Sequence, residues 1–423
     1  MRNIAILLLS DIHLKINKQV ENQGLVITEF FKDIAKTLQN IPFEDRFCII
    51  SGDLVDVGGV EDSYSEFTKR FLEPLCKHVA LKNIFCIPGN HDLNRSFVNG
   101  HKDDYDKWIN SEDDDTRFNE TIKDSEYFTK AFNHFIKFRN TSLSADYQSI
   151  FGYSCNIIPE ISLMCLNTAI LSNGGLDKSD PSNRFPKDSQ NLRVETSGLF
   201  EWSENNEGRT KILVMHHPVS DLTDYLQHQL DAVIKQSVDI HINGHTHFQK
   251  YEPKLHNGRI IHTMTSPQLF SSKVDINGYS ILHFNGKDLQ TIEYRQWSPK
   301  NHHFMVGAEL ADDDTGIIIA ETYQNKQALE NDILQAKLNE SLFLFNYQMP
   351  WCHRILSKTV SSSISKNEGT LDYIGIINSK NDYQIVAPQQ FGLTSFARHL
   401  ILKAFEIKGQ QWAYIDMSTG CNH

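Results

Sequence analysis

The sequence lacks the features typical of secreted, membrane-spanning or disordered proteins. Its seven cysteines are an odd number, widely scattered, and never form a Cys-x-x-Cys pair, which disfavours a disulfide framework or a thiolate metal site. No apolar run reaches the roughly 20 residues that a membrane helix needs, and no low-complexity tract is visible. We therefore expect a cytoplasmic protein with reduced thiols and no membrane partner.

Basic charge is also scarce. The 41 lysines and arginines are outnumbered by 53 acidic residues, which gives a formal net charge of -12. The chain as a whole therefore does not attract a polyanion such as long DNA. Divalent cations in an active site would bring their own positive charge, so phosphate chemistry remains open.

Short apolar runs alternate with helical patterns along the first two thirds of the chain. Buried strands are predicted at 3–10, 46–51, 83–87, 161–166, 210–215 and 238–242, and helices for example at 25–38 and 64–75. Later runs at 259–264, 278–285 and 289–295 predict antiparallel strands. Strands that alternate with helices indicate an α/β fold, here with a mixed sheet or a sandwich of sheets.

The chain is long enough for more than one domain. We predict a catalytic domain at 1–300 and a smaller α/β unit at 301–423 that begins with a long amphipathic helix at 324–346. Within the first domain, the polar segment 97–143 reads as an inserted, lid-like element over the sheet edge. A solvated excursion is an equally good interpretation of this segment.

Potential metal ligands follow five of the predicted strands. The motifs are Asp11-x-His13, Gly52-Asp53, Gly89-Asn90-His91-Asp92, His216-His217-Pro218 and Gly244-His245-Thr246-His247. Open α/β sheets place their sites at the carboxyl ends of strands. We therefore expect these side chains to meet at one rim.

Seven of these side chains are candidate metal ligands, and no organic cofactor is expected. They are Asp11, His13, Asp53, Asn90, His216, His245 and His247. Imidazole mixed with carboxylate suits Zn, Mn or Fe. If one carboxylate is shared, the set supplies two divalent ions, and two ions roughly 3.5 to 4 Å apart can hold a hydroxide and neutralise a phosphoryl group.

Together, the order and spacing of the five motifs resemble the calcineurin-like metallophosphoesterase superfamily over roughly residues 1–295. The resemblance implies a metallophosphoesterase-type α/β sandwich of mixed sheets flanked by helices. It also implies a division of the ligands: Asp11, His13 and His247 for one ion, Asn90, His216 and His245 for the other, and Asp53 as the bridge.

The same resemblance implies that His91 and Asp92 are catalytic. His91 would contact the phosphate and protonate or steady the leaving oxygen, and Asp92 would orient His91. We expect His217 to lie behind the ligands or to be structural.

The motifs differ from those of protein Ser/Thr phosphatases, which resemble Gly-Asp-x-x-Asp-Arg-Gly and Gly-Asn-His-Glu. Here Val57 stands in place of the arginine, and Asp92 replaces the glutamate. The forms found are more similar to the bacterial nucleotide phosphodiesterase and nuclease branch. We expect a phosphodiester substrate in nucleic acid or a nucleotide; a phosphomonoesterase or an inactive metal-binding interaction module are the alternatives.

Residues 387–395, Ala-Pro-Gln-Gln-Phe-Gly-Leu-Thr-Ser, resemble a degenerate phosphate-binding loop of a STAND-type NTPase. Leu393 stands where the lysine should be, which argues against nucleotide binding, and a chance strand–turn–helix is as good an interpretation. If the resemblance holds, the chain is the front part of a longer switch protein, such as a bacterial antiviral defence protein with an effector enzyme at its N-terminus. A further C-terminal domain or a second copy of the chain would then be a partner.

Overall fold

The chain forms two units in the computed structural model, Met1–Gln324 and Asn325–His423. The described residues are 2–16, 22–109, 118, 122, 126–143, 149–179, 185–247, 249–256, 259–271, 276–311, 313–320, 356–359, 368–371 and 400. In the second unit they include an antiparallel hairpin of β14 (Leu356–Thr359) and β15 (Glu368–Leu371). The helix predicted at 324–346 and the loop at 387–395 lie outside the described residues.

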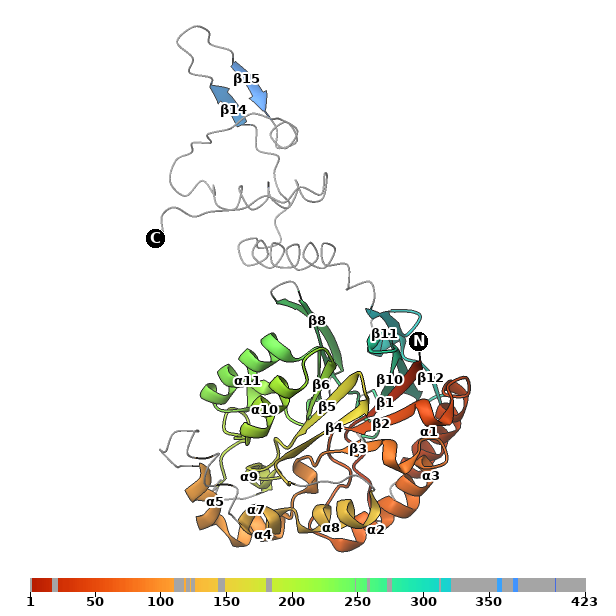
Figure 1. The fold of residues 1–423 in the computed structure, drawn as a ribbon, viewed down its shortest axis with the longest axis vertical. Coiled ribbons are helices and arrows are strands. Elements are labelled where there is room, and N and C mark those ends of the chain that lie inside the picture. Colours follow the sequence, from red (N-terminus) through yellow and green to blue (C-terminus); the bar gives the residue numbers. More distant parts are fainter. Residues whose placement is uncertain are drawn as a thin grey trace. The chain divides into compact units, whose positions relative to one another are not determined.

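Two mixed sheets form the centre of the first unit (Figure 1). The first has the strand order β12-β11-β10-β1-β2-β3, and β13 also pairs with β11. Strands β1 (Asn3–Leu9), β2 (Arg46–Ile50) and β3 (Ile84–Cys86) are parallel. Strands β10 (Gly278–Asn285), β11 (Asp288–Ser298), β12 (His303–Val306) and β13 (Ile317–Ile319) add antiparallel pairs, as predicted for the first two.

The second sheet has the order β4-β5-β6-β7-β9-β8. Its parallel strands are β5 (Ile161–Leu166), β6 (Thr210–Met215), β7 (Ile240–Asn243) and β9 (Arg259–Thr265), and its antiparallel edges are β4 (Gly152–Ile158) and β8 (Lys250–His256). The prediction of β9 as an antiparallel strand was wrong with respect to β7. The chain first reverses direction between β8 and β9, so that β9 runs parallel to β7. Strand β8 was not predicted, because its residues are half-buried or exposed and form no apolar run.

The two sheets pack face to face. Ile6 and Leu8 of β1 share one buried cluster with Ile212 and Val214 of β6, whereas Leu7 of β1 faces a different cluster on the outer side. Burial on both faces explains why β1 reads as an uninterrupted apolar run. The predicted α/β sandwich of two mixed sheets flanked by helices is therefore confirmed.

Helices cover both outer faces of the sandwich (Figure 1). On the second sheet lie α10 (Ser197–Asn205) and α11 (Asp224–Ser237). On the first lie α1 (Gln23–Thr37) and α2 (Glu61–Phe67), which continues through a π-helical turn η2 (Thr68–Leu72) into α3 (Glu73–Leu75). Further short helices lie between the strands: η1 (Phe43–Asp45), η3 (Leu81–Asn83), η4 (Asn90–Asp92), η6 (Val219–Asp221), α9 (Leu176–Ser179) and α12 (Ala308–Ala311).

The described part of segment 97–143 packs into the core of the first sheet. It contributes most of α4 (Arg95–Gly100), and α5 (Lys102–Ile109), α7 (Glu126–Ala131) and α8 (Asn133–Ser142). Phe128, Phe132 and Phe135 are buried in the same cluster as Leu7 of β1. Truncating one of these rings to alanine would cost about 3 to 5 kcal/mol, so this segment helps to hold the sheet.

None of the five described cysteines is part of a disulfide: Cys48, Cys76, Cys86, Cys155 and Cys165. Among the described helices, none combines the length and the apolar character needed to span a bilayer.

Candidate metal centre

The five motifs meet where the parallel strands of both sheets end. Each motif begins within four residues of the last residue of its strand: β1, β2 and β3 in the first sheet, β6 and β7 in the second. Backbone hydrogen bonds join the motifs, since Asp11 N donates to Gly52 O (3.1 Å) and Gly244 N donates to His216 O (2.9 Å). The structure thus brings all seven predicted ligand side chains to one place.

The first group is Asp11, His13 and His247. Asp11 Oδ1 lies 3.6 Å from His13 Nε2 and 3.2 Å from His247 Nε2. This oxygen is buried and receives no hydrogen bond from a described residue, although Oδ2 of the same carboxylate accepts one from Ser10 Oγ at 2.5 Å. A buried carboxylate oxygen without a donor is unfavourable. A cation between it and the two imidazoles would satisfy it.

The second group is Asn90, His216 and His245. Asn90 Oδ1 lies 3.0 Å from both His216 Nε2 and His245 Nδ1. His216 Nδ1 lies 2.8 Å from Ser51 O, which can only accept, so Nδ1 carries a proton. In the neutral ring Nε2 then has a lone pair that faces the amide oxygen. Such converging acceptors fit a metal ion.

Asp53 lies between the two groups. Its Oδ2 is 3.7 Å from His13 Nε2 and 3.5 Å from His216 Nε2, so a single oxygen reaches both. Burial alone would raise the pKa of Asp53, but the charges of the surrounding histidines and a hydrogen bond from His216 together outweigh burial and lower it. The site therefore keeps an ionised, buried carboxylate at its centre.

The pKa values of two of the imidazoles shift in opposite directions. Burial lowers the pKa of His216, but the Asp53 carboxylate outweighs burial and raises it to about 9. For His245, burial and the nearby charge of His216 lower the pKa to about 4. The negative charge of Asp53 thus favours positive charge next to His216, as a cation-binding site requires.

Backbone strain concentrates in the same residues. Five of the eight described non-glycine residues with positive φ are predicted ligands: Asp11 (50°), His13 (44°), Asp53 (53°), His245 (67°) and His247 (61°). Each such conformation costs roughly 1 to 3 kcal/mol. Gly89 allows a close approach, because a Cβ there would lie 2.2 Å from Asp53 Oδ1. The fold maintains this strain where the side chains must turn back toward a common point.

His91 lies beside the first group, with its ring 4.5 Å from that of His13. Its Nδ1 lies 3.0 Å from Asp56 O and 3.0 Å from Arg95 Nη2. Asp56 and Arg95 were not singled out from the sequence. Their distance from the motifs could have identified them, because Asp56 lies three residues after Asp53 and Arg95 lies four residues after His91.

The structure corrects the expected contact between Asp92 and His91. The Asp92 carboxylate instead accepts hydrogen bonds from Gly89 N (2.9 Å), Leu54 N (3.2 Å) and Tyr64 Oη (3.0 Å). Adjacent side chains on a helical turn point in different directions. Burial, with the charge of Asp53, raises the pKa of Asp92 to about 7. Asp92 thus ties together the loops after β2 and β3.

His217 lies behind the second group, with its ring 4.4 Å from that of His245. It is fully buried, and its Nδ1 lies 3.0 Å from Thr168 Oγ1. Asp221 Oδ2 lies 3.9 Å from His245 Nε2. Thr168 and Asp221 were not expected from the sequence, because neither belongs to one of the five motifs.

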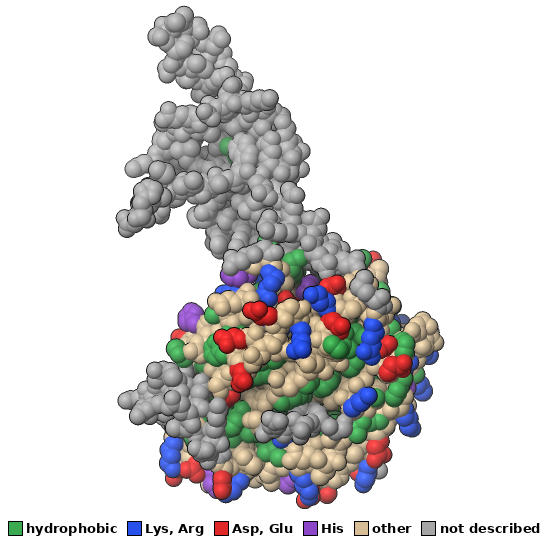
Figure 2. Space-filling view, viewed as in Figure 1, with side chains coloured by type: hydrophobic (Ala, Val, Ile, Leu, Met, Phe, Trp, Pro, Cys, Tyr) green, Lys and Arg blue, Asp and Glu red, His purple; other side chains and the backbone are tan. Residues whose placement is uncertain are grey.

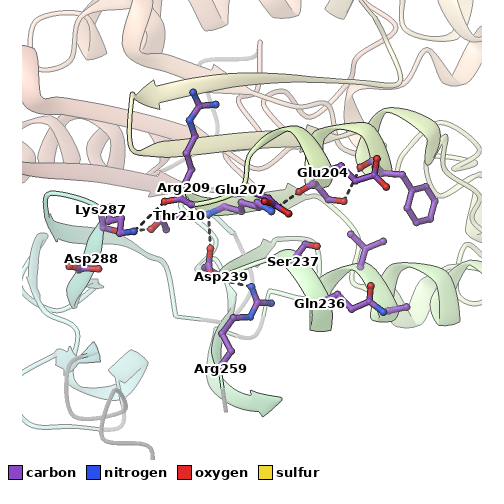
Figure 3. A pocket seen from close by; sticks show the side chains of 16 residues that line it. Glu204, Glu207, Arg209, Thr210, Gln236, Ser237, Asp239, Arg259, Lys287 and Asp288 are labelled. Carbon is purple, nitrogen blue, oxygen red and sulfur yellow. Dashed lines mark hydrogen bonds and ion pairs between the residues drawn. The ribbon is translucent and has the colours of Figure 1, made fainter. Parts of the chain in front are cut away.

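A hollow lies at the end of the second sheet where the strands begin, opposite the metal centre (Figure 3). Its volume is about 760 Å³. Asp239 accepts hydrogen bonds from Lys211 N (2.8 Å) and Arg259 Nη1 (3.2 Å), and Arg259 Nη2 donates to Val238 O (3.0 Å). These contacts connect strand starts to the end of α11, so the charges here serve the fold.

Charge on the surface is mixed. Figure 2 shows basic and acidic side chains interspersed on one face of the first unit, without a basic stripe among the described residues of that face. This agrees with the net charge of -12. Among the described residues, potential ligand atoms cluster at the strand ends. Those of Asp11, His13 and His247 lie within 4.8 Å of one another, and so do those of Asp11, Asp53 and His216.

Comparison with solved structures finds distant similarities. A "predicted phosphoesterase" of Streptococcus pneumoniae is 9% identical, with 73% of this chain and 95% of that chain covered and a TM-score of 0.28. GAP50, "the anchor in the inner membrane complex of Plasmodium", is 12% identical (72% and 89% covered, TM-score 0.34). "A novel archaeal phosphodiesterase" is 13% identical (69% and 98% covered, TM-score 0.29). At these identities and TM-scores, the similarity carries no conclusion about function.

No curated protein matches the sequence. The model of the calcineurin-like phosphoesterase family matches residues 4–249. This segment is more than half of the 423 residues and contains all five motifs. The chain therefore belongs to the calcineurin-like phosphoesterase family, whose members act on phosphoester bonds with a pair of metal ions.

Proposed function

We propose that the protein is a phosphodiesterase that hydrolyses phosphodiester bonds in nucleic acid or nucleotides with two divalent transition-metal ions, Mn, Fe or Zn. The position of Asp53 Oδ2 between the two ligand groups, 3.7 Å from His13 Nε2 and 3.5 Å from His216 Nε2, carries this proposal. When bound, such an ion pair supplies the charge that holds a phosphate and activates the attacking water.

The first ion would be held by Asp11, His13 and His247, the second by Asn90, His216 and His245, and both by Asp53. Neighbouring groups orient these ligands. Ser51 O fixes the tautomer of His216, and Ser10 Oγ turns Asp11 so that Oδ1 faces the two imidazoles. Such outer contacts fix the ring and carboxylate orientations that metal binding needs.

His91 would handle the leaving group. Its Nδ1 edge faces Asp56 and Arg95, and its side chain is 28% exposed, so the Nε2 edge is left for substrate. In the reaction a water oxygen bonds to phosphorus while the bond from phosphorus to the leaving oxygen breaks. The Nε2–H group of the neutral His91 ring would keep its proton and donate a hydrogen bond that steadies the leaving oxygen, which takes its proton from solvent, and the proton of the water goes to solvent. Asp92 would act indirectly, by fixing the loop that carries His91.

Diesters are preferred in this proposal because Val57 occupies the position where an arginine would grip a phosphomonoester dianion. A phosphomonoesterase is the alternative. An inactive metal-binding interaction module is disfavoured, because a scaffold has no need to keep five ligand residues in left-handed conformations at roughly 1 to 3 kcal/mol each.

The wider role belongs to the same proposal. Residues 387–395 support a place in a longer STAND-like protein through their sequence resemblance, with the phosphodiesterase as effector of a bacterial antiviral defence system in the cytoplasm. A further C-terminal domain or a second copy of the chain would be the partner. The domain limits, 1–300 and 301–423 with the segment 97–143 as a lid, stay predictions.

The test compares bis(4-nitrophenyl) phosphate with 4-nitrophenyl phosphate as substrates of the Mn-loaded, Fe-loaded and Zn-loaded protein. Asp53→Asn is the site variant, and Asp288→Asn makes the same chemical change at the exposed first residue of β11, on the opposite edge of the fold. Diester preference that is lost only in Asp53→Asn supports the proposal and leads to single-stranded DNA, RNA and cyclic nucleotides as substrates. Monoester preference would favour the alternative, and turnover of neither by metal-loaded protein would favour the interaction module.

A further inference from the structure

Arg95 lies beside His91 and contacts it. It is the first residue of α4, and its Nη2 lies 3.0 Å from His91 Nδ1. Its Nε is buried and has no hydrogen-bond partner among the described residues. Leaving a buried guanidinium nitrogen unpaired is unfavourable, so packing around the side chain must hold it in place.

The loop after β5 provides that packing. Gly174 has a φ of 62°, and a Cβ there would lie 3.0 Å from Asn90 O and 3.1 Å from Arg95 Cγ and Nε. The loop is itself tied down, because Asn173 N donates to Asp188 Oδ1 at 3.0 Å. The absence of a side chain at Gly174 thus lets the loop backbone press directly on Arg95 and on the residue that precedes His91.

The contact with His91 is directional, because a guanidinium can only donate. Arg95 donates to Nδ1 when this nitrogen has a lone pair, which leaves the ring proton on Nε2. Asp56 O, which can only accept, lies 3.0 Å from the same nitrogen. Whichever of the two is bonded, Arg95 and Asp56 hold the Nδ1 edge of the ring, and Nε2 is directed away from them.

We propose that Arg95 is a positioning residue for His91: it fixes the direction of Nε2 toward the leaving oxygen and so sets how strongly the rate depends on the leaving group. This inference rests on the proposed phosphodiesterase function. In this chain Val57 replaces the arginine of the Gly-Asp-x-x-Asp-Arg-Gly pattern, and Arg95 brings a guanidinium to the site from the loop after β3 instead.

The test uses Arg95→Met, which keeps most of the stem and removes the donors, and Arg95→Ala, which leaves space for free guanidinium. Arg209→Met is the matched control, because it makes the same chemical change at an arginine that donates to Pro159 O and lies at the opposite edge of the fold. Metal content is measured together with kcat and KM on diesters with a nitrophenyl and with a poorer phenyl leaving group.

For Arg95→Met we expect unchanged metal content and a KM within about threefold of wild type. We expect kcat to fall about 10- to 100-fold for the phenyl diester but less than about threefold for the nitrophenyl diester. Added guanidinium should restore part of the loss in Arg95→Ala and none in Arg95→Met. Equal losses on both diesters, or loss of metal, would overturn the positioning role.

A second pair of variants tests the loop contact. Gly174→Ala and Gly175→Ala both place a side chain at positive φ, 62° and 85°, but only Gly174 has Arg95 and Asn90 within reach of the new Cβ. Gly174→Ala should reproduce the leaving-group effect of Arg95→Met, and Gly175→Ala should not. The same effect in both would point to loop strain and overturn the contact.

Failure of the proposed function is distinguishable from failure of this inference. If the wild type hydrolyses neither diester, the proposed function fails, but the ¹⁵N spectrum of the Zn-loaded protein still reports on His91. The His91 ring signals are assigned by their loss in His91→Gln. A changed tautomer or shift of these signals in Arg95→Met supports the contact, and unchanged signals overturn it.

Discussion

The two sheets contribute different chemistry to the same centre. The first supplies both carboxylates, Asp11 and Asp53, with Asn90 and one imidazole, whereas the second supplies imidazoles alone. Burial raises the pKa of a carboxylate, yet the pKa values of Asp11 and Asp53 are lowered, because the histidines around them favour the charged forms. The first sheet thus sets the charge of the site, and the second would complete the coordination of the proposed ions with imidazole donors.

The largest expected effect follows from removing charge on the first sheet. Asp53→Asn should prevent binding of both ions and reduce diester turnover on the order of 10³-fold or more, because the shared carboxylate is the charge that both ions need. Metal content by mass spectrometry and turnover are the measurements. Two ions per chain in this variant would remove Asp53 from the bridging role.

Removing a neutral donor from the second sheet should have a smaller and more local effect. His245→Ala should lower the affinity for one ion and leave the other, since Asp11, His13 and His247 remain. A titration with Zn, followed by calorimetry, should show one tight site in place of two. Loss of both ions would mean that the imidazoles of the second sheet, too, control the whole centre.

Substitution of a residue that lies at the rim but is not a ligand should leave metal binding intact. His91→Gln should keep both ions and reduce turnover about 100-fold for a poor leaving group, with a smaller loss for an activated aryl ester. Paired assays on two diesters measure this. A variant that lost its metal would instead place His91 among the ligands.

The smallest effect concerns buried histidines of the second sheet away from the centre. Burial lowers the pKa values of His241 and His262 to about 4. Between about pH 6.5 and 4 the unfolded chain binds protons that the folded chain does not, so stability falls as the pH falls. At pH 5 each histidine should cost about 2 kcal/mol.

Urea unfolding at pH 7 and pH 5 tests this, with His241→Gln as the comparison. The variant should lose about 2 kcal/mol less than wild type between the two pH values. An identical loss in both proteins would show that His241 is protonated in the folded state or reached by water.

Much of the fold could be predicted from the sequence, because strands that are buried on both faces consist of unbroken apolar runs. Strands β5 and β6 were predicted with the bounds that they have, and β1 and β2 within one residue. Strand β8 was missed because its residues are mostly half-buried or exposed. The helix predicted at 64–75 contains a π-helical turn that apolar spacing does not reveal.

For the site, the sequence determined which residues take part, and the tertiary structure decided which of their atoms contact one another. Motifs that follow strands could be assigned to one rim, because the carboxyl ends of parallel strands share an edge. Which atom of Asp53 lies between the groups, and that His91 turns to Asp56 and Arg95 and not to Asp92, could not be read from the sequence. These contacts depend on left-handed backbone turns and on loops brought together by the packing of two sheets, which spacing along the chain does not encode.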